Sequence, residues 1–384
     1  MRAVKTIRFQ FVASDALTGL LEDFRSMCND AIRIALKAKP RNKFTLQTVA
    51  YPRLKEYGLF AHYIQSACEV AFSVYRNRNR KKDPYIKRPF LKLEAGCYRV
   101  DHLLLRLPVR ARDYIFLVLQ PSAYHLAIID DPNLKRGSVT LTARTVSIAF
   151  SKEVEELEPC GQIGVDINER NVTWSDSQGS VKQKDTSTVA EVKERYREIR
   201  ASVAKKTRGD RRIAKELLAK YGKREKDRTV QAIHRVSKEL VEGAKGSQFG
   251  IVMENLKGIR KLYRRGNGQG SSYRARMNSW AFREFQRQVL YKAAWSGVPV
   301  KIVNSKGTSS YCLCGSRVVP LADRKLYCPR CDITWDRDVL ASKNIMAAAQ
   351  GPAARPPTYE AVMERSSDAG VNLLSRKAES GAAG

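Results

Sequence analysis

The sequence predicts two α/β units in tandem: a set of strands interrupted by a helical insert, then a second unit of strands and long helices. Two patterns lead to this prediction. Strand-like alternation at residues 1–11 gives way to apolar residues at helical intervals and resumes near residue 98, and strand-like runs alternate with helical stretches from about 159 onward. A length of 384 residues with 43% apolar composition suffices for two or three folded domains.

The first predicted unit covers residues 1–158, and its helical insert covers about 14–82, where apolar residues recur every three or four positions. Strand-like patterns follow at Leu103–Leu107, Tyr114–Leu119, His125–Ile129 and Val139–Phe150.

The second predicted unit covers residues 159–348. It begins with hairpin-linked strands, continues through a helical region at 188–243 and returns to a strand that ends at Glu254. Residues 349–384 are rich in Ala, Gly, Pro and Ser, which predicts a disordered tail.

The charge of the chain predicts a polyanionic partner. Lys and Arg number 70 against 39 acidic residues, a formal net charge of +31. Such an excess repels itself in the folded state, and nucleic acid is the usual compensating partner. No apolar run approaches 18 residues and the N-terminus has no apolar signal core, so we expect no membrane partner and a cytoplasmic, nucleoid-associated protein.

Three basic segments are candidate nucleic-acid contacts. Residues 193–238 contain 17 Lys or Arg and six Asp or Glu, and an apolar stripe leaves their polar face basic. The run at 76–82 is either a phosphate-contacting segment or a solvated loop, and the glycine-rich stretch at 260–270 is either a mobile lid or an ordinary surface loop. The candidates are Arg76, Arg78, Arg80, Lys81, Lys82, Arg211, Arg212, Arg224, Arg264 and Arg265.

Three acidic residues form a candidate catalytic site. Asp166 and Glu254 lie at the ends of apolar, strand-like runs, and Asp338 lies at the start of a helix-like segment. Hydrolysis of a phosphodiester needs an activated water and a stabilised leaving oxygen, which two Mg²⁺ ions held by carboxylates can provide. Alone, the three acids can be read as a turn residue, an ion-pair partner and a first-turn acid. Together, in so basic a chain, they predict a metal-dependent nuclease.

Four of the eight cysteines predict a structural zinc site. Cys312 and Cys314 form one knuckle, Cys328 and Cys331 form the other, and the 13 residues between them suit a hairpin within a ribbon at about 305–335. The first knuckle has one intervening residue instead of two. The alternative is a degenerate ribbon that no longer holds metal.

These motifs together resemble the TnpB (OrfB) family of insertion sequences and the related compact type V CRISPR effectors. The resemblance rests on the blocks at 164–168 and 251–256, on Thr308-Ser309 before the cysteines, and on Cys328 through Asp338 to Asn344. It implies an α/β RuvC-like nuclease domain of RNase H fold with an inserted zinc ribbon, and an N-terminal wedge β-barrel that carries a helical insert. Asp166, Glu254 and Asp338 match the family's catalytic, Mg²⁺-binding triad, and the four clustered cysteines match its zinc ligands.

The resemblance further implies an RNA-guided DNA endonuclease, encoded by a prokaryotic transposable element, that binds a guide RNA and cuts a double-stranded DNA target beside a short flanking motif. Leu340 departs from the family, which usually has Asn there. Four alternatives remain: a compact type V effector, an RNA-guided binder that represses without cutting, a zinc-ribbon DNA-binding regulator and a strand-transfer transposase. A zinc-ribbon regulator would leave the acidic motifs unexplained. A strand-transfer transposase would need a nucleophilic tyrosine motif, and none is evident in the sequence.

Overall fold

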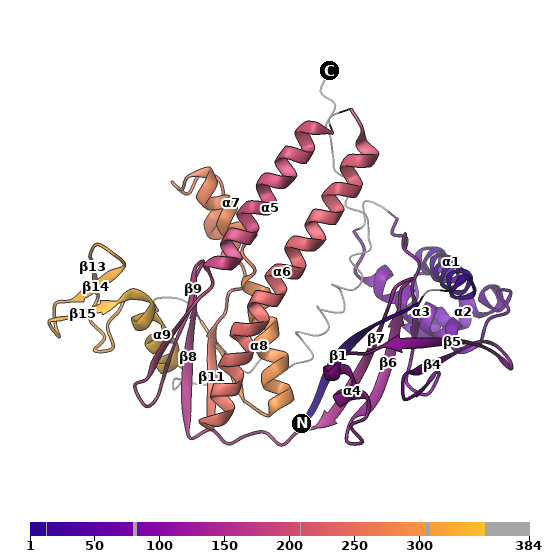
Figure 1. Ribbon diagram of the computed structural model, residues 1–384, viewed down its shortest axis with the longest axis horizontal. Coiled ribbons are helices and arrows are strands. Elements are labelled where there is room, and N and C mark those ends of the chain that lie inside the picture. Colours follow the sequence, from indigo (N-terminus) through magenta and orange to yellow (C-terminus); the bar gives the residue numbers. More distant parts are fainter. Residues whose placement is uncertain (13, 80–82, 208, 305–307, 350–384) are drawn as a thin grey trace. The chain divides into compact units, whose positions relative to one another are not determined.

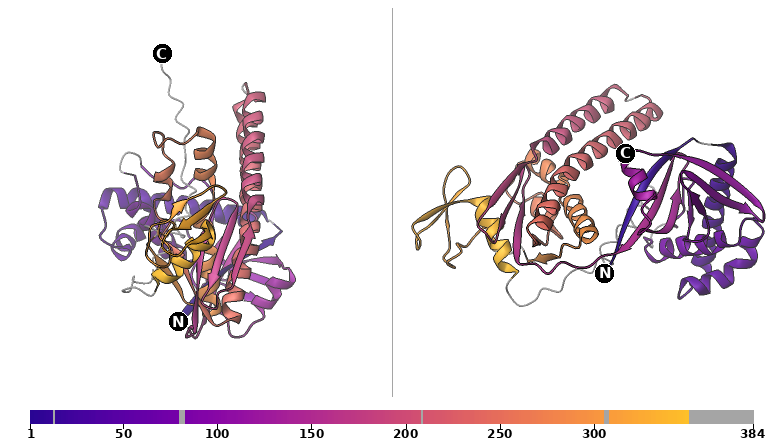
Figure 2. Two further views of the ribbon diagram at one scale, coloured as in Figure 1. Left: turned by 90° about the vertical axis from the view of Figure 1, so that its left-hand side faces the viewer. Right: turned by 60° about the horizontal axis from the view of Figure 1, so that its bottom comes forward.

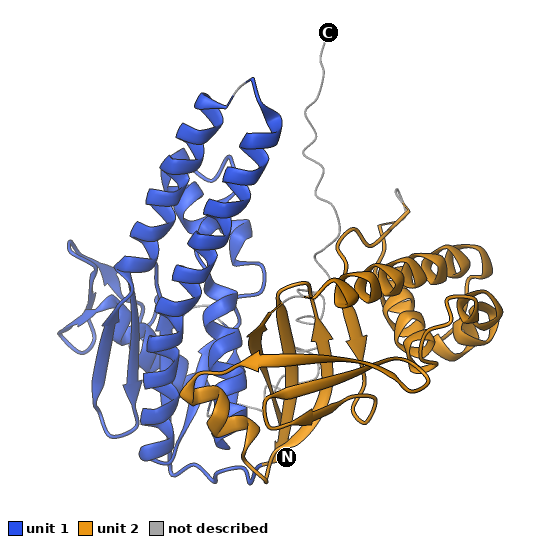
Figure 3. Cartoon of the chain, turned by 45° about the vertical axis from the view of Figure 1, so that its right-hand side comes forward, with its two compact units in different colours: residues 1, 154–362 blue, residues 2–153, 363–384 orange. Residues whose placement is uncertain are grey.

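The computed structural model describes residues 1–12, 14–79, 83–207, 209–304 and 308–349. The chain divides into two units, drawn in two colours in Figure 3. We call residues 2–153 the N-terminal unit, and Met1 with residues 154–349 the C-terminal unit. The predicted tail at 349–384 lies outside the described residues apart from Ala349.

The N-terminal unit contains one seven-stranded sheet, in which the strand order is β2-β6-β7-β1-β5-β4-β3. Its longest pairing joins β1 and β7, antiparallel from Arg2 opposite Glu153 to Gln10 opposite Thr145. The strands are β1 (Arg2–Phe11), β2 (Leu91–Leu93), β3 (Arg99–Asp101), β4 (Leu104–Arg110), β5 (Asp113–Gln120), β6 (Lys135–Leu141) and β7 (Thr145–Glu153).

The predicted helical insert is three helices, α1 (Asp15–Ala38), α2 (Lys43–Lys55) and α3 (His62–Arg76). The helix α1 begins at Ser14, whose side chain accepts a hydrogen bond from the backbone of Leu17 and so satisfies one of the free N–H groups of the first turn. Its apolar stripe is fully buried, as the three- and four-residue spacing predicts.

The strand predicted at His125–Ile129 is wrong, because these residues end the short helix α4 (Ala123–Ile129). Ser122 and His125 form a capping box: the Nδ1 atom of His125 accepts from the backbone N–H of Ser122 at 2.9 Å. This local pairing starts a helix where the apolar pattern alone is ambiguous. The segment Val139–Phe150 is also two strands, β6 and β7, separated by a turn.

The C-terminal unit contains a five-stranded sheet in the order β10-β9-β8-β11-β12. β8 pairs with β11 in parallel and with β9 antiparallel, and β11 pairs with β12 in parallel. The strands are β8 (Gly161–Ile167), β9 (Asn171–Asp176), β10 (Val181–Asp185), β11 (Phe249–Glu254) and β12 (Val300–Val303).

Helices cover both faces of this sheet (Figure 1). Odd-numbered strand residues such as Val165, Ile251 and Met253 share a core with the last turns of α6 and with α8, whereas Val252 shares one with Ile345 of α9. The helices are α5 (Ser187–Lys206), α6 (Arg211–Gly246), the 3₁₀ turn η1 (Ile259–Tyr263), α7 (Ser271–Ser279), α8 (Phe282–Ser296) and α9 (Arg337–Ala348). The predicted helical region at 188–243 is therefore the antiparallel pair α5 and α6, which Figure 2 shows as two adjacent rods.

A separate three-stranded sheet precedes α9, in the order β13-β14-β15. It consists of β13 (Val319–Pro320), β14 (Lys325–Cys328) and β15 (Ile333–Asp336), all antiparallel. The hairpin predicted between the knuckles is formed by β13 and β14, and β15 follows the second knuckle. Of the helices in the described ranges, none combines the length and apolarity needed to cross a bilayer.

Candidate active site and cysteine cluster

The structure places the three acidic residues on one side of the five-stranded sheet. Asp166 is the next-to-last residue of β8 and Glu254 is the last residue of β11, and these parallel neighbours end at the same edge. Side chains alternate along a strand, so Asp166 and Glu254 face the same way as Gly164 and Val252, toward α9. Asp338 is the second residue of α9.

Asp166 and Glu254 are held by side chains that donate to their carboxylates. The amide of Asn168 donates to Oδ2 of Asp166 at 2.7 Å, and the hydroxyl of Thr308 donates to Oε1 of Glu254 at 2.5 Å. Burial is the main cause that raises the pKa of Asp166 to about 7, and the negative charges of Glu254 and Asp338 raise it further. Burial also raises the pKa of Glu254.

Asp338 is nearly fully buried and has two partners. The amide of Asn171 donates to its Oδ2 at 3.1 Å, and the guanidinium of Arg324, from the turn before β14, pairs with its Oδ1. Asp336, two residues earlier, caps the helix: its Oδ1 accepts hydrogen bonds from the backbone N–H groups of Asp338 and Val339. Asp336 is therefore the N-cap of α9.

The donor set fits divalent cations. Two buried polar atoms beside the carboxylates, Thr173 Oγ1 and Asn171 Oδ1, have no hydrogen-bond partner among the described residues, and Thr173 pairs with Asp166 across the strands. A hard cation, with the waters that it retains, would satisfy such oxygens and offset the repulsion that raises the pKa of Asp166.

The four clustered cysteines form the other candidate metal centre. Their sulfur atoms all lie within 4.8 Å of one another, which holds for no other group of three or more His, Cys, Asp or Glu in the described ranges. The hydrogen-bonded thiol of Cys314 and the neighbouring thiols raise the pKa of Cys331 to about 12. A closed set of four sulfurs is the ligand set of structural zinc.

Leu340 connects the cysteine cluster to α9. It is fully buried and packs with Cys312, Val318, Leu326 and Cys328 in one apolar cluster. The position where the family usually has Asn is therefore a packing contact, two residues beyond Asp338. The first turn of α9 therefore both contacts the ribbon, through Leu340, and carries the carboxylate of Asp338.

The described members of the predicted basic set lie at the end of α3, on α6 and after η1. Arg76 ends α3 and Arg78 follows it, stacked 3.9 Å from the ring centre of Tyr75; Arg80, Lys81 and Lys82 lie outside the described residues. In the C-terminal unit, Arg211, Arg212 and Arg224 are exposed on α6, and Arg264 and Arg265 are exposed after η1. Their exposure is compatible with phosphate contacts.

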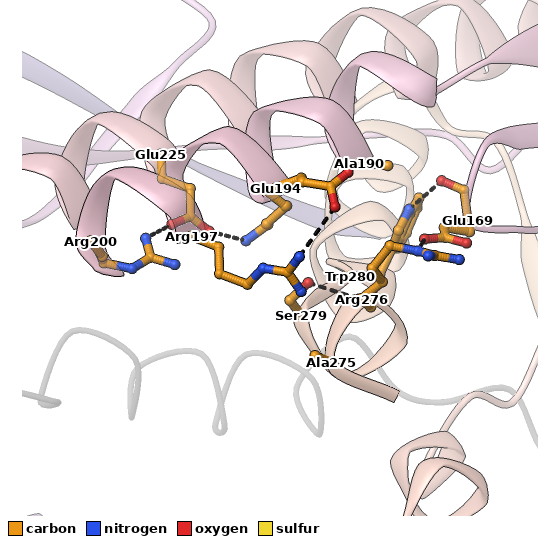
Figure 4. Close-up of a pocket in the computed structure, with 11 residues that line it drawn as sticks. Glu169, Ala190, Glu194, Arg197, Arg200, Glu225, Ala275, Arg276, Ser279 and Trp280 are labelled. Atoms are coloured by element: carbon orange, nitrogen blue, oxygen red, sulfur yellow. Dashed lines mark hydrogen bonds and ion pairs between the residues drawn. The ribbon is translucent and has the colours of Figure 1, made fainter. Parts of the chain in front are cut away.

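A charged pocket lies between α5, α6 and α7, close to the site (Figure 4). Glu169, three residues beyond Asp166, pairs with the Nε atom of Arg276 at 2.7 Å, and its carbonyl accepts from Trp280 Nε1 at 2.6 Å. Nearby, Glu225 pairs with Lys193 and Arg200. Each acidic side chain that lines the pocket is paired with a basic one, and we interpret the Glu169–Arg276 pair as the contact that ties α7 to the end of β8.

Comparisons with known proteins agree on one family. A family model described as the Cas12f1-like TNB domain matches residues 282–345. A TnpB-like protein of Methanocaldococcus jannaschii is 31% identical over 255 residues, which is 64% of this chain and 91% of that protein. The chain belongs to the TnpB family. The TnpB family is related to the compact type V effectors, as the sequence resemblance predicts.

The fold of this TnpB-family chain is shared with Cas12f1. A cryo-EM structure of a Cas12f1–sgRNA–target DNA complex superposes with a TM-score of 0.60 at 12% identity, and covers 90% of this chain and 99% of that one. The likeness supports the prediction of a RuvC-like α/β fold.

Three contacts of the candidate site were not assigned from the sequence: Asn171 and Arg324 to Asp338, and Thr308 to Glu254. Thr308 lies in a block that the family resemblance uses, and Asn344 ties that block to α9 by donating to the carbonyl oxygens of Thr308 and Tyr311 at 2.8 and 2.7 Å. Asn171 opens a strand and Arg324 lies in a turn, so neither position carries a sequence signal for the site.

The raised pKa of Asp166 predicts a pH-dependent cost in stability. Between its ordinary pKa of 3.8 and about 7, the folded chain retains a proton that the unfolded chain has lost. The folded chain is therefore destabilised relative to the unfolded chain as pH rises through this window. In EDTA, Asp166→Asn is expected to match the wild type near pH 4 and to exceed it at pH 8, by at most about 4 kcal/mol in the free energy of unfolding.

Thermal unfolding from pH 4 to 8 measures this difference. The matched control is Asp227→Asn, an exposed aspartate on α6, which should follow the wild type at every pH. The prediction would be contradicted if the difference in the free energy of unfolding between Asp166→Asn and the wild type stayed constant with pH.

Proposed function

We propose that this chain is an RNA-guided, Mg²⁺-dependent DNA endonuclease, encoded by a transposable element and acting on the nucleoid of a prokaryotic cell. The observation that carries the proposal is the placement of Asp166, Glu254 and Asp338 on one covered face of the sheet. Membership in the TnpB family supports it.

Each carboxylate has a role in this proposal. Asp166 and Glu254 would hold divalent ions from adjacent strand ends, and Asp338 would complete the set from the helix start. Two such ions, when bound, activate the attacking water and stabilise the leaving oxygen of the phosphodiester. Asn168 and Thr308 keep the two strand carboxylates oriented through their hydrogen bonds.

The nucleic acids would be held mainly by their backbones. A guide RNA pairs with the target strand of double-stranded DNA, and the protein reads only a short flanking motif. The sheet of the N-terminal unit would act as the wedge barrel of the family, with the α1–α3 insert as its recognition part. The exposed arginines of α6 and of the segment after η1 would contact phosphates.

The cysteine cluster would hold one structural zinc ion, because four sulfurs leave no open position for chemistry. Its proposed role is to fix the ribbon against Leu340.

One observation favours a second candidate, an RNA-guided binder that does not cut. The guanidinium of Arg324 already neutralises Asp338, so it competes with any cation for that carboxylate. Cleavage requires Arg324 to move away or to share Asp338 with a metal ion.

The test is cleavage of plasmid DNA by the chain co-expressed with RNA from its own locus. The target carries a randomised flanking library, Mg²⁺ is supplied, and Asp166→Ala is the matched variant. We expect motif-dependent loss of plasmids with the wild type and none with Asp166→Ala.

Three other results would each count against the proposal. Motif-dependent capture of intact plasmids would support the non-cutting binder. Cleavage by protein that is free of RNA would refute the role of a guide. Cleavage that persists in Asp166→Ala would refute the proposed site.

A further inference from the structure

An apolar and basic face of the N-terminal sheet is left exposed. Along β5 the residues alternate, with Ile115, Leu117 and Leu119 buried and the even-numbered residues exposed. The exposed fractions are 41% for Tyr114, 56% for Phe116, 62% for Val118 and 40% for Leu104, which lies opposite Val118 on β4. Large apolar side chains that share one open sheet face are typical of an interaction surface.

Arginines flank these rings on the same face. Arg106 of β4 lies opposite Phe116 and also opposite Arg99 of β3, so the three form a row across the strands. The guanidinium of Arg106 lies 4.6 Å from the ring centre of Tyr114. The face therefore combines flat aromatic surfaces with positive charge.

Glutamines border the other side of the face. Gln120 of β5 pairs with Gln10 of β1, and both side chains are exposed. Amide side chains can donate and accept at once, as the edges of nucleobases require.

We propose that this face, which we call the β5 platform (Leu104, Arg106, Tyr114, Phe116, Val118), binds unpaired bases of single-stranded RNA by stacking. A sheet that presents aromatic side chains beside arginines is how proteins bind single-stranded nucleic acid, because every base has a π-face and every nucleotide has a phosphate.

Two physical arguments favour RNA over other occupants. A second copy of this chain, in an isologous interface, would bring Arg106 of the platform and the neighbouring Arg99 face to face with their own copies, in a chain of net charge +31. A double-stranded DNA target offers no unpaired bases until it is opened, whereas a folded RNA carries unpaired loops at all times. The inference rests on the proposed RNA partner and assigns it a contact surface.

The test measures the affinity of the full chain for RNA transcribed from its own locus, by filter binding, with three forms of position 116. Phe116→Leu keeps apolar surface and removes the ring, and Phe116→Tyr keeps the ring. Loss of a stacked base is expected to raise the Kd of Phe116→Leu about tenfold or more, while Phe116→Tyr stays within about twofold of the wild type. All three should have the same Tm, because the side chain is exposed.

Salt dependence separates stacking from phosphate binding. A plot of log affinity against log salt should keep its slope in Phe116→Leu, and should lose about 0.7 in Arg99→Gln if that arginine contacts one phosphate. Ultraviolet cross-linking of the complex should attach RNA to the peptide that contains Phe116.

The outcomes distinguish the two proposals. If the wild type does not bind the RNA, the proposed function fails. If it binds and Phe116→Leu binds equally well, the β5 platform is refuted while the proposed function stands. A shift from dimer to monomer in Phe116→Leu, with unchanged RNA affinity, would assign the face to a second copy instead.

Discussion

Gly164→Ala is expected to abolish most cleavage and to destabilise the C-terminal unit. At this position in β8, an added Cβ would overlap the carbonyl oxygen of Ser342 and lie 2.7 Å from the backbone nitrogen of Met346. Both are backbone atoms of α9, so no side-chain rotation relieves the clash. The helix must move away from the sheet, and Asp338 in its first turn must move with it.

The expected size follows from two general costs. Overpacking against backbone costs about 3 kcal/mol, which corresponds to a fall in Tm on the order of 10 °C for a unit of this size. A displacement of about 1 Å in a catalytic group costs about 100-fold in rate. The measurements are thermal unfolding and the rate of guided DNA cleavage, and binding of RNA should be unchanged.

Gly250→Ala is the matched control, one strand away in β11. There the added Cβ meets Oε1 of Gln162 at 2.6 Å, the far end of a flexible side chain that can turn aside. We expect a change in Tm of no more than a few degrees and a rate near that of the wild type. If Gly164→Ala cleaves as fast as Gly250→Ala, then close docking of α9 on β8 is not what positions Asp338.

The sequence predicted the strand-end and helix-start positions of the three acids because periodicity marks where apolar runs stop. It could not show that Asp166 and Glu254 share a face. That follows from the parallel pairing of β8 with β11, whose strands are separated by more than 80 residues of chain. The family resemblance supplied this grouping, and local patterns did not.

The sequence also could not predict the partners of Asp338. Arg324 reaches the carboxylate from a turn in which it and Asp323 both have positive φ, at 60° and 55°. A turn with two non-glycine residues in the left-handed region has no strong sequence signature, so the sequence does not predict that Arg324 is directed toward Asp338. For the same reason, Leu340 appeared in the sequence as the loss of a polar group, whereas the structure gives it a packing role in the ribbon.

Cys328→Ser is expected to remove zinc and to reduce cleavage about 100-fold or more without loss of RNA binding. Cys328 is the last residue of β14 and is fully buried in the cluster that contains Leu340, and its sulfur lies 3.6 Å from that of Cys314. A hydroxyl there cannot replace a thiolate ligand, and a zinc ribbon that loses its metal loses most of its folding energy.

The loss is expected to reach the active site through two short connections. Within the ribbon, β15 ends at Asp336, which caps α9, and Leu340 packs in the ribbon cluster one half-turn beyond Asp338. When the ribbon unfolds, the cap and this packing both weaken, and Asp338 is no longer held at the strand ends. Metal content by mass spectrometry should fall from one zinc per chain to none, in parallel with the cleavage rate.

Cys160→Ser provides the control, since Cys160 is an exposed cysteine of the same unit outside the cluster. It should retain both zinc and cleavage, which separates loss of a ligand from general oxidation. Zinc-free Cys328→Ser protein that still cleaves at the wild-type rate would show that the ribbon does not position Asp338. Wild-type protein without zinc and with full activity would instead identify the cluster as a degenerate ribbon, held by its apolar packing around Leu340 alone.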